Sequence, residues 1–384
     1  MNSKNVISLT QKLITFNTIN PPGNEMELAK YVGNLLTENG FDVEYILFEE
    51  NRLHLIAEKG LSRTKLPIVF TGHLDTVPLG AKQWSVNPMS GEIVDDKIYG
   101  RGSSDMKGGI AALIIAAIES FEDNSPKGGV RLVITAGEEL GCQGAQHLAK
   151  TYKKWGEASG LIIAEPTANI PAIGHKGGLY LNISTTGVTA HSSMPELGVN
   201  AIYKAAKAIT KIENFRFDAE EDSLLGMPTI NVGKMSGGMN LNSVPDHAEF
   251  TIDVRSTTKV NHTEIIQKLN NELGEDVKIE TLVNLKPVST KENEPFVQLV
   301  YDVCKVDRTS SKFPKALPYL TDGSVLQSAF NNVPTIILGP GQPEMAHQTN
   351  EFCYIDKIEN AVDIYKKIIK NKLNILNILE TKMS

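Results

Sequence analysis

The chain has 384 residues, which is long enough for a large core and more than one domain. Hydrophobic residues make up 41% of it and charged residues 22%, as is usual for globular proteins. The formal net charge is −7, and no block of lysines and arginines provides the basic face of a nucleic-acid-binding protein. The apolar run at 110–118 is too short to span a membrane. We therefore expect neither a nucleic-acid partner nor a membrane segment.

The N-terminus and the cysteines indicate the compartment. Gln11 and Lys12 interrupt the first apolar residues, so no signal peptide is predicted. The three cysteines are Cys142, Cys304 and Cys353, and this odd, widely spaced set contains no CxxC motif. Such spacing argues against a disulfide framework and against a thiolate zinc site. The sequence therefore predicts a cytoplasmic protein.

Strand patterns alternate with helical patterns through the first half of the chain. Short apolar runs predict strands at 68–71, 130–135 and 161–164. Helical patterns cover 106–121 and 144–152. Strands separated by helices predict a mostly parallel sheet with helices on both faces.

The pattern changes after Lys176. Apolar and polar residues alternate at 179–185 and 249–255, which is typical of an antiparallel sheet with one solvent-exposed face. Helical patterns follow at 199–212 and 262–273.

A buried-strand pattern returns at 334–338. We therefore predict an α/β fold in which a mixed, mostly parallel sheet is flanked by helices and interrupted by an inserted α+β domain. The expected domains are 1–176 with 288–384, and the insertion 177–287.

Side chains that bind metals follow several of the predicted strands, and one precedes a predicted helix. They are His73, Asp75, Asp105, Glu138, Glu139, Glu165 and His347. Each alone has an ordinary explanation, and Asp105 in particular could cap the helix that follows it. Ligands of open α/β sheets, however, bind beyond the carboxyl ends of the strands, where these residues are expected to meet. Imidazole nitrogen and carboxylate oxygen are common ligands of zinc, so the sequence favours a metal centre at this edge.

The motifs resemble those of the M20 metallopeptidase family, and within it the branch of acetylornithine deacetylase and succinyl-diaminopimelate desuccinylase. In the predicted catalytic domain they are GHLDTVP (72–78), YGRGSSDMKGG (99–109), TAGEELG (135–141), AEPT (164–167) and AHQTNE (346–351). In the predicted insertion they are HSSMPELGVNAI (191–202), NSVPD (242–246) and DVR (253–255). The resemblance extends over almost the whole chain, and the order of the motifs is more specific than any one of them.

The resemblance implies a site for two zinc ions, which Co²⁺ could replace. His73 and Glu165 would bind one ion, Glu139 and His347 would bind the other, and Asp105 would bridge the two.

It also implies the roles of residues around the metals. Asp75 would support the His73 ligand, and Glu138 would act as general base and general acid. His191 would come from the inserted domain of a partner subunit in a homodimer and stabilise the oxyanion of the reaction. Asn242 and Arg255 would contact the substrate. The inserted domain would serve as both lid and dimer interface.

The implied reaction is removal of the acyl group from an N-acyl amino acid, a small molecule of the N-acetylornithine or N-succinyl-diaminopimelate type. Gly177 and Gly178 provide no positive charge for a succinyl carboxylate, but the segment 319–326 is compatible with either substrate. An exopeptidase, either a dipeptidase or a carboxypeptidase, is a second interpretation. A non-catalytic binding protein is a third, although such a protein should have lost Glu138 or a ligand. No GxGxxG motif supports a dinucleotide-binding protein.

Overall fold

The computed structural model describes residues 4–123, 126, 128–307 and 315–383. The chain forms two compact units. The first comprises Met1–Gly174, Ser289–Leu317 and Thr321–Ser384, and the second comprises His175–Val288 and Pro318–Leu320. Residues 177–287 all fall within the second unit. Among the described residues, no helix has both the length and the apolar composition needed to cross a bilayer.

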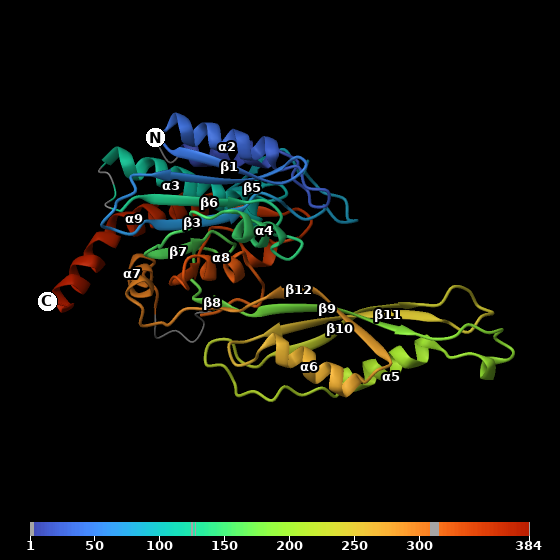
Figure 1. Ribbon diagram of the computed structural model, residues 1–384. Helices are drawn as coiled ribbons and strands as arrows, with labels where there is room; N and C mark the ends of the chain where they lie inside the picture. Colours follow the sequence, from blue (N-terminus) through green and yellow to red (C-terminus); the bar gives the residue numbers. More distant parts are fainter. Residues whose placement is uncertain (1–3, 124–125, 127, 308–314, 384) are drawn as a thin grey trace. The chain divides into compact units, whose positions relative to one another are not determined.

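A six-stranded mixed sheet forms the centre of the first unit (Figure 1). Its strands, in spatial order, are β1 (Asp42–Glu49), β2 (Arg52–Lys59), β6 (Val130–Thr135), β3 (Ile68–His73), β7 (Gly160–Ile163) and β14 (Thr335–Ile337). Strands β6, β3, β7 and β14 are mutually parallel, whereas β2 is antiparallel to both of its neighbours. This confirms the mixed, mostly parallel sheet that the alternating pattern predicts.

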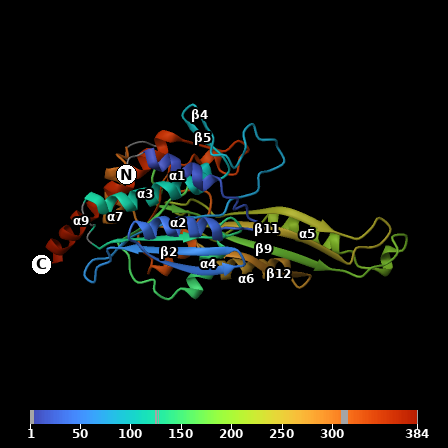
Figure 2. The ribbon, with the colours of Figure 1, turned by 90° about the horizontal axis from the view of Figure 1, so that it is seen from above.

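Helices cover both faces of this sheet. They are α1 (Lys4–Ile14), α2 (Met26–Glu38), α3 (Gly108–Asp123), α4 (Gln143–Thr151), α7 (Pro295–Val303), α8 (Gly323–Ala329) and α9 (Ile355–Met383). Successive residues of a strand point to opposite faces. Leu55 of β2 lies against Gly33 of α2, and its neighbour His54 stacks on His147 of α4, so α2 and α4 cover opposite faces. Figure 2 shows α1, α3 and α9 side by side, which buries α3 from Ile110 to Ile118.

The second unit is a four-stranded antiparallel sheet with two helices on one face (Figure 1). Its strands, in spatial order, are β10 (Thr229–Gly237), β11 (His247–Ser256), β9 (Gly177–Thr186) and β12 (Val277–Leu285). The helices are α5 (Ala201–Glu213) and α6 (His262–Leu273), and Asn200 and Asn261 cap their first turns through side-chain oxygens. Burial alternates along β11, because only one face of the sheet packs on these helices.

Two small sheets and three short helical segments are the remaining described elements. A three-stranded sheet contains β15 (Phe352–Tyr354), β5 (Lys97–Tyr99) and β4 (Ile93–Val94), and a two-stranded sheet pairs β13 (Val288–Ser289) with β8 (Gly174–His175). The single-turn helices are η2 (Pro195–Leu197) and η3 (Pro343–Met345), whereas η1 (Ser103–Lys107) is an irregular turn in which Asp105 and Met106 depart from helical backbone angles.

Candidate metal centre

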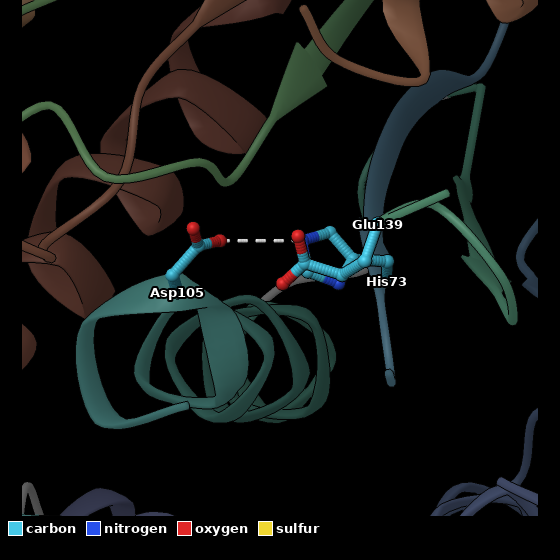
Figure 3. Close-up of side chains that lie close together, drawn as sticks. All are labelled: His73, Asp105 and Glu139. Atoms are coloured by element: carbon cyan, nitrogen blue, oxygen red, sulfur yellow. Dashed lines mark hydrogen bonds and ion pairs between the residues drawn. The ribbon is translucent and has the colours of Figure 1, made fainter. Parts of the chain in front are cut away.

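The carboxyl ends of the parallel strands bring the predicted ligands together. His73 is the last residue of β3 and pairs with Thr135, the last residue of the neighbouring β6. The Glu138–Glu139 pair follows β6, and Glu165 follows β7. Asp105 lies in η1, where the chain enters α3, and points toward the His73 imidazole (Figure 3). Residues more than 90 positions apart in the sequence therefore share one edge of the sheet.

Asp105 lies between two histidines. Its Oδ1 is 3.2 Å from Nε2 of His73, and its Oδ2 is 3.4 Å from Nε2 of His347. The His73 Nε2 is also 3.7 Å from Oε1 of Glu165, and the His347 Nε2 is 3.1 Å from Oε2 of Glu139. Asp105 thus separates two groups of donors, each with one imidazole and one further carboxylate.

The donor set fits divalent cations of the zinc type. His73, Asp105 and Glu139 each offer a ligand atom within 4.8 Å of the others. Oε1 of Glu139 is buried and has no hydrogen-bond partner among the described residues, which leaves it available to a cation. Two imidazoles and three carboxylates are typical of zinc ligation, and the carboxylates offset most of the charge of two divalent ions.

Crowding of negative charge shifts the pKa values in this cluster. Burial raises the pKa of Glu165 well above its usual value, and the charge of Asp105 adds to the shift. Burial and Asp105 also raise the pKa of Glu139. Hydrogen bonds to Asp105 and Glu139 raise the pKa of His347 to about 10. Burial alone would raise the pKa of Asp105, but hydrogen bonds from both histidines outweigh it and lower the pKa. A cation would favour the ionised carboxylates and neutral imidazoles that ligation requires.

Asp75 holds the loop that carries Glu138 and Glu139. Its Oδ1 accepts the backbone N–H groups of Gly137 and Glu138 at 2.9 and 3.0 Å, and its Oδ2 accepts that of Glu139 at 3.1 Å. The Nδ1 of His73 lies 2.9 Å from the backbone oxygen of Asp75 and 3.6 Å from its carboxylate. The contact that orients His73 is therefore made chiefly by the main chain of Asp75, whereas its carboxylate fixes the Glu138–Glu139 turn.

Glu351 is a second buried carboxylate of this kind, and its role was not predicted from the sequence. Its Oε1 accepts the backbone N–H groups of Ser104 and Asp105 at 2.8 and 2.9 Å. Its Oε2 accepts that of Gly102 at 2.9 Å and pairs with Arg101 at 2.7 Å. The AHQTNE motif contained the signal, because a glutamate four residues after a metal-ligand candidate is well placed to support a neighbouring loop.

Glu138 stands apart from the donors that surround Asp105. It is 9% exposed, and its Oε1 accepts the thiol of Cys142 at 3.4 Å. Burial raises its pKa well above the usual value, and the charges of Asp322 and Glu139 add to this shift. A glutamate in such surroundings is suited to carry a proton near neutral pH.

Comparison with known proteins identifies the family. The sequence profile of "Peptidase family M20/M25/M40" matches residues 69–371. The chain belongs to this family. It is accordingly an M20 hydrolase, and members of the family are typically metal-dependent.

Curated relatives of this M20 chain match it over most of its length. A Staphylococcus epidermidis protein named "Probable succinyl-diaminopimelate desuccinylase" is 32% identical and covers 96% of this chain and 98% of its own. "Acetylornithine deacetylase" of Vibrio parahaemolyticus is 30% identical and covers 88% of this chain and 90% of its own. These matches confirm the family resemblance that the motifs indicate.

A solved structure agrees with the fold. An M20 family metallo-carboxypeptidase from Sulfolobus solfataricus gives a TM-score of 0.78 over 96% of this chain and 99% of that chain. Its sequence is 20% identical, so the similarity shows the fold alone. The α/β fold with an inserted unit is therefore the M20 fold.

The remaining candidate residues of this M20 chain lie in the second unit. His191 and Asn242 are both exposed and lie close together, because His191 pairs with Ser243 and the backbone oxygen of Asn242 accepts the Ser192 N–H at 3.0 Å. Arg255 is near one end of β11, where its guanidinium pairs with Asp253 at 3.0 Å.

A long strand separates these two groups. Arg255 pairs with Gly178 of β9, whereas His247, at the other end of β11, pairs with Thr186. The eight residue steps from His247 to Arg255 span about 27 Å of strand. His191 lies beyond the His247 end, because the pairing continues outward to Ser243. The second unit therefore carries its two groups of candidate substrate residues at opposite ends.

Proposed function

We propose that this M20 hydrolase removes the acyl group from an N-acyl amino acid of the N-acetylornithine or N-succinyl-diaminopimelate type, in the cytoplasm and as a homodimer. The observation that carries the proposal is the position of Asp105 between His73 and His347, with Glu138 outside the ligand group. The names of the relatives at 32% and 30% identity support the substrate class.

Two divalent cations, Zn²⁺ with Co²⁺ as a substitute, are the proposed cofactors. One ion would be held by His73 and Glu165, and the other by Glu139 and His347. Asp105 would contribute to both sites, because it lies close to both histidines. When bound, such ions make a nearby water more acidic and polarise a substrate carbonyl. The buried carboxylates of Asp75 and Glu351 hold the loops that carry the ligands.

Glu138 is the proposed general base. It takes a proton from the water that attacks the amide carbon, and it later gives this proton to the leaving amine. The raised pKa of Glu138, caused first by burial, supports a role in which the carboxyl group holds a proton between the two steps.

Arg255 and, from the partner subunit, Asn242 are the proposed substrate contacts, because Asn242 lies beside His191 at the end of the second unit opposite Arg255. An N-acyl amino acid presents a free carboxylate, which the planar guanidinium of Arg255 could bind with two parallel hydrogen bonds. In this structure Nε and Nη2 of Arg255 both donate to Oδ2 of Asp253, at 3.2 and 3.0 Å, and a substrate carboxylate would take the place of this contact.

His191 is proposed to donate to the oxyanion of a partner subunit's site. The separation of Arg255 from His191 by about 27 Å of strand supports this role. An N-acyl amino acid is no longer than about three residues of extended chain, or about 11 Å. One substrate therefore cannot reach both residues of the same chain.

Exposed apolar side chains around His191 support the homodimer. Leu197, Tyr203 and Met239 are each about two-thirds exposed, and Leu241 is fully exposed. Apolar groups gathered on one region of a surface are typical of a protein–protein interface.

A substrate panel tests the proposed function. The purified protein is assayed with N-acetylornithine, N-succinyl-diaminopimelate, simple N-acyl amino acids and dipeptides, and release of free amine is measured. We expect the highest kcat/KM for one of the N-acyl amino acids. Cleavage of dipeptides alone would make the protein an exopeptidase, and hydrolysis of none would make it a binding protein.

A further inference from the structure

Asp322 occupies a helix-capping position without capping the helix. It immediately precedes α8, yet its side chain makes no hydrogen bond to the first turn of that helix. The carboxylate is 2% exposed, and its Oδ2 accepts the hydroxyl of Thr135 at 2.5 Å. An aspartate at this position usually accepts the N–H groups of the first turn. The side chain is therefore directed toward the end of β6, the strand that leads into Glu138.

Cys142 lies between Asp322 and Glu138. One polar atom of each of these three buried side chains lies within 4.8 Å of the other two. The backbone N–H of Cys142 donates to the carbonyl of Glu138 at 2.7 Å, and its thiol donates to Oε1 of Glu138 at 3.4 Å. Burial raises the pKa of Cys142 well above its usual value, and the two neighbouring carboxylates raise it further. The sulfur therefore keeps its proton and remains a donor.

We propose that Cys142 and Asp322 together form a positioning unit for Glu138. The thiol of Cys142 fixes Oε1 of Glu138, which leaves Oε2 to accept the proton of the attacking water. Asp322 packs against the sulfur, and its hydrogen bond to Thr135 ties the unit to β6. The inference rests on the proposed role of Glu138 as general base.

The proton balance of the step is simple. The O–H bond of water breaks as an H–Oε2 bond forms on Glu138, and the same proton later moves to the amine nitrogen. The thiol proton is not transferred, because Cys142 acts only as a fixed donor. Neither residue touches the substrate, so both are positioning residues.

Kinetics of matched variants test the positioning role. Cys142→Ala should lower kcat about 10-fold with little change in KM, since one hydrogen bond to the base is lost. Cys142→Ser keeps a donor and should recover kcat to within about threefold of the parent. Asp322→Asn should also lower kcat, and the double variant Cys142→Ala/Asp322→Asn should be no slower than the slower single variant, because the two residues act as a unit. Cys304→Ala, at the end of α7, is the control and should leave kcat unchanged.

An infrared measurement tests the contact without substrate. The S–H stretching band that disappears in Cys142→Ala should shift in frequency in Glu138→Ala, because the thiol loses Oε1 of Glu138 as its acceptor. The proposal would be overturned if the S–H band were unchanged in Glu138→Ala. It would also be overturned if kcat were unchanged in Cys142→Ala, or if the loss of kcat in the double variant equalled the product of the two single losses. Sulfur-to-cobalt charge-transfer absorption in the Co²⁺-loaded protein would also overturn it, because Cys142 would then bind metal. The S–H band is measured without substrate. The contact between Cys142 and Glu138 can therefore be confirmed or rejected even if the protein proves not to be a deacylase.

Discussion

Oε1 of Glu351 accepts the backbone N–H of Asp105 at 2.9 Å, and Glu351 lies four residues after His347 in the same segment. One loop therefore supplies a candidate ligand and also fixes the backbone of the carboxylate that this ligand contacts. The carboxylate of Asp75 likewise accepts the backbone N–H groups of Glu138 and Glu139, and Asp75 lies two residues after the candidate ligand His73. The candidate metal centre is thus held by two buried carboxylates, each of which satisfies several backbone N–H groups.

Glu351→Gln should weaken metal binding. The parent carboxylate accepts from four donors, and a glutamine amide group would turn its own N–H groups toward some of them. Loss of support of this kind typically lowers metal affinity about 10- to 100-fold. Competition with a chelator of known affinity measures the change. The exposed Glu344→Gln is the control, and equal affinities in both variants would show that Glu351 does not position Asp105.

Glu138→Gln should keep metal binding while turnover falls roughly 100- to 10,000-fold, since a general base is lost and no ligand is removed. Metal analysis and kcat are measured on the same preparation. If the metal is lost together with activity, Glu138 is a ligand and its role has been exchanged with that of Glu139.

Arg255→Ala should lower kcat/KM about 10- to 100-fold for substrates with a free α-carboxylate, because hydrogen bonds to a charged group are lost. The matching α-amide should already be a poor substrate of the parent protein, and its kcat/KM should change little in Arg255→Ala. Arg255→Lys keeps the charge but not the planar pair of donors, so it should restore only part of the loss. Equal losses for acid and amide would make Arg255 structural, as its contact with Asp253 allows.

If His191 acts at the site of the partner subunit, two inactive variants should complement each other. Glu138→Ala and His191→Ala are each expected to be inactive, but a heterodimer of the two should contain one intact site. Mixing them under conditions of subunit exchange should therefore restore part of the activity. Exchange is followed independently with tagged chains. If exchange is complete and activity does not return, His191 acts within its own chain or has no part in the reaction.

The strand-end residues could be placed from the sequence because parallel strands end at a common edge. His73, Glu139 and Glu165 each follow an apolar run, and such runs predict both the strand and its end. Their closeness to one another follows from the order of the strands, in which β3 lies between β6 and β7.

The β1–β2 hairpin and the partners of its buried polar side chains were not predicted. Strand β2 contains Arg52 and His54, which interrupt its apolar pattern although both are buried. Arg52 is satisfied by Glu25, and His54 accepts the Ala136 N–H, and these partners lie far away in the sequence. Contacts of this kind depend on the completed fold, so no local pattern reveals them. The same reason applies to Asp322, whose sequence position suggests only a helix cap.

Metal titration of the stripped protein tests the two-metal hydrolase most directly. Zn²⁺ is added in increments to the chelator-treated chain, and bound metal and release of free amine from the best N-acyl amino acid are measured together. The stripped protein should be inactive, activity should reach a plateau at about two equivalents per chain, and Co²⁺ should also restore it. His73→Ala should bind less metal and stay inactive. Full turnover by the stripped protein, or activity that does not follow bound metal, would contradict the account.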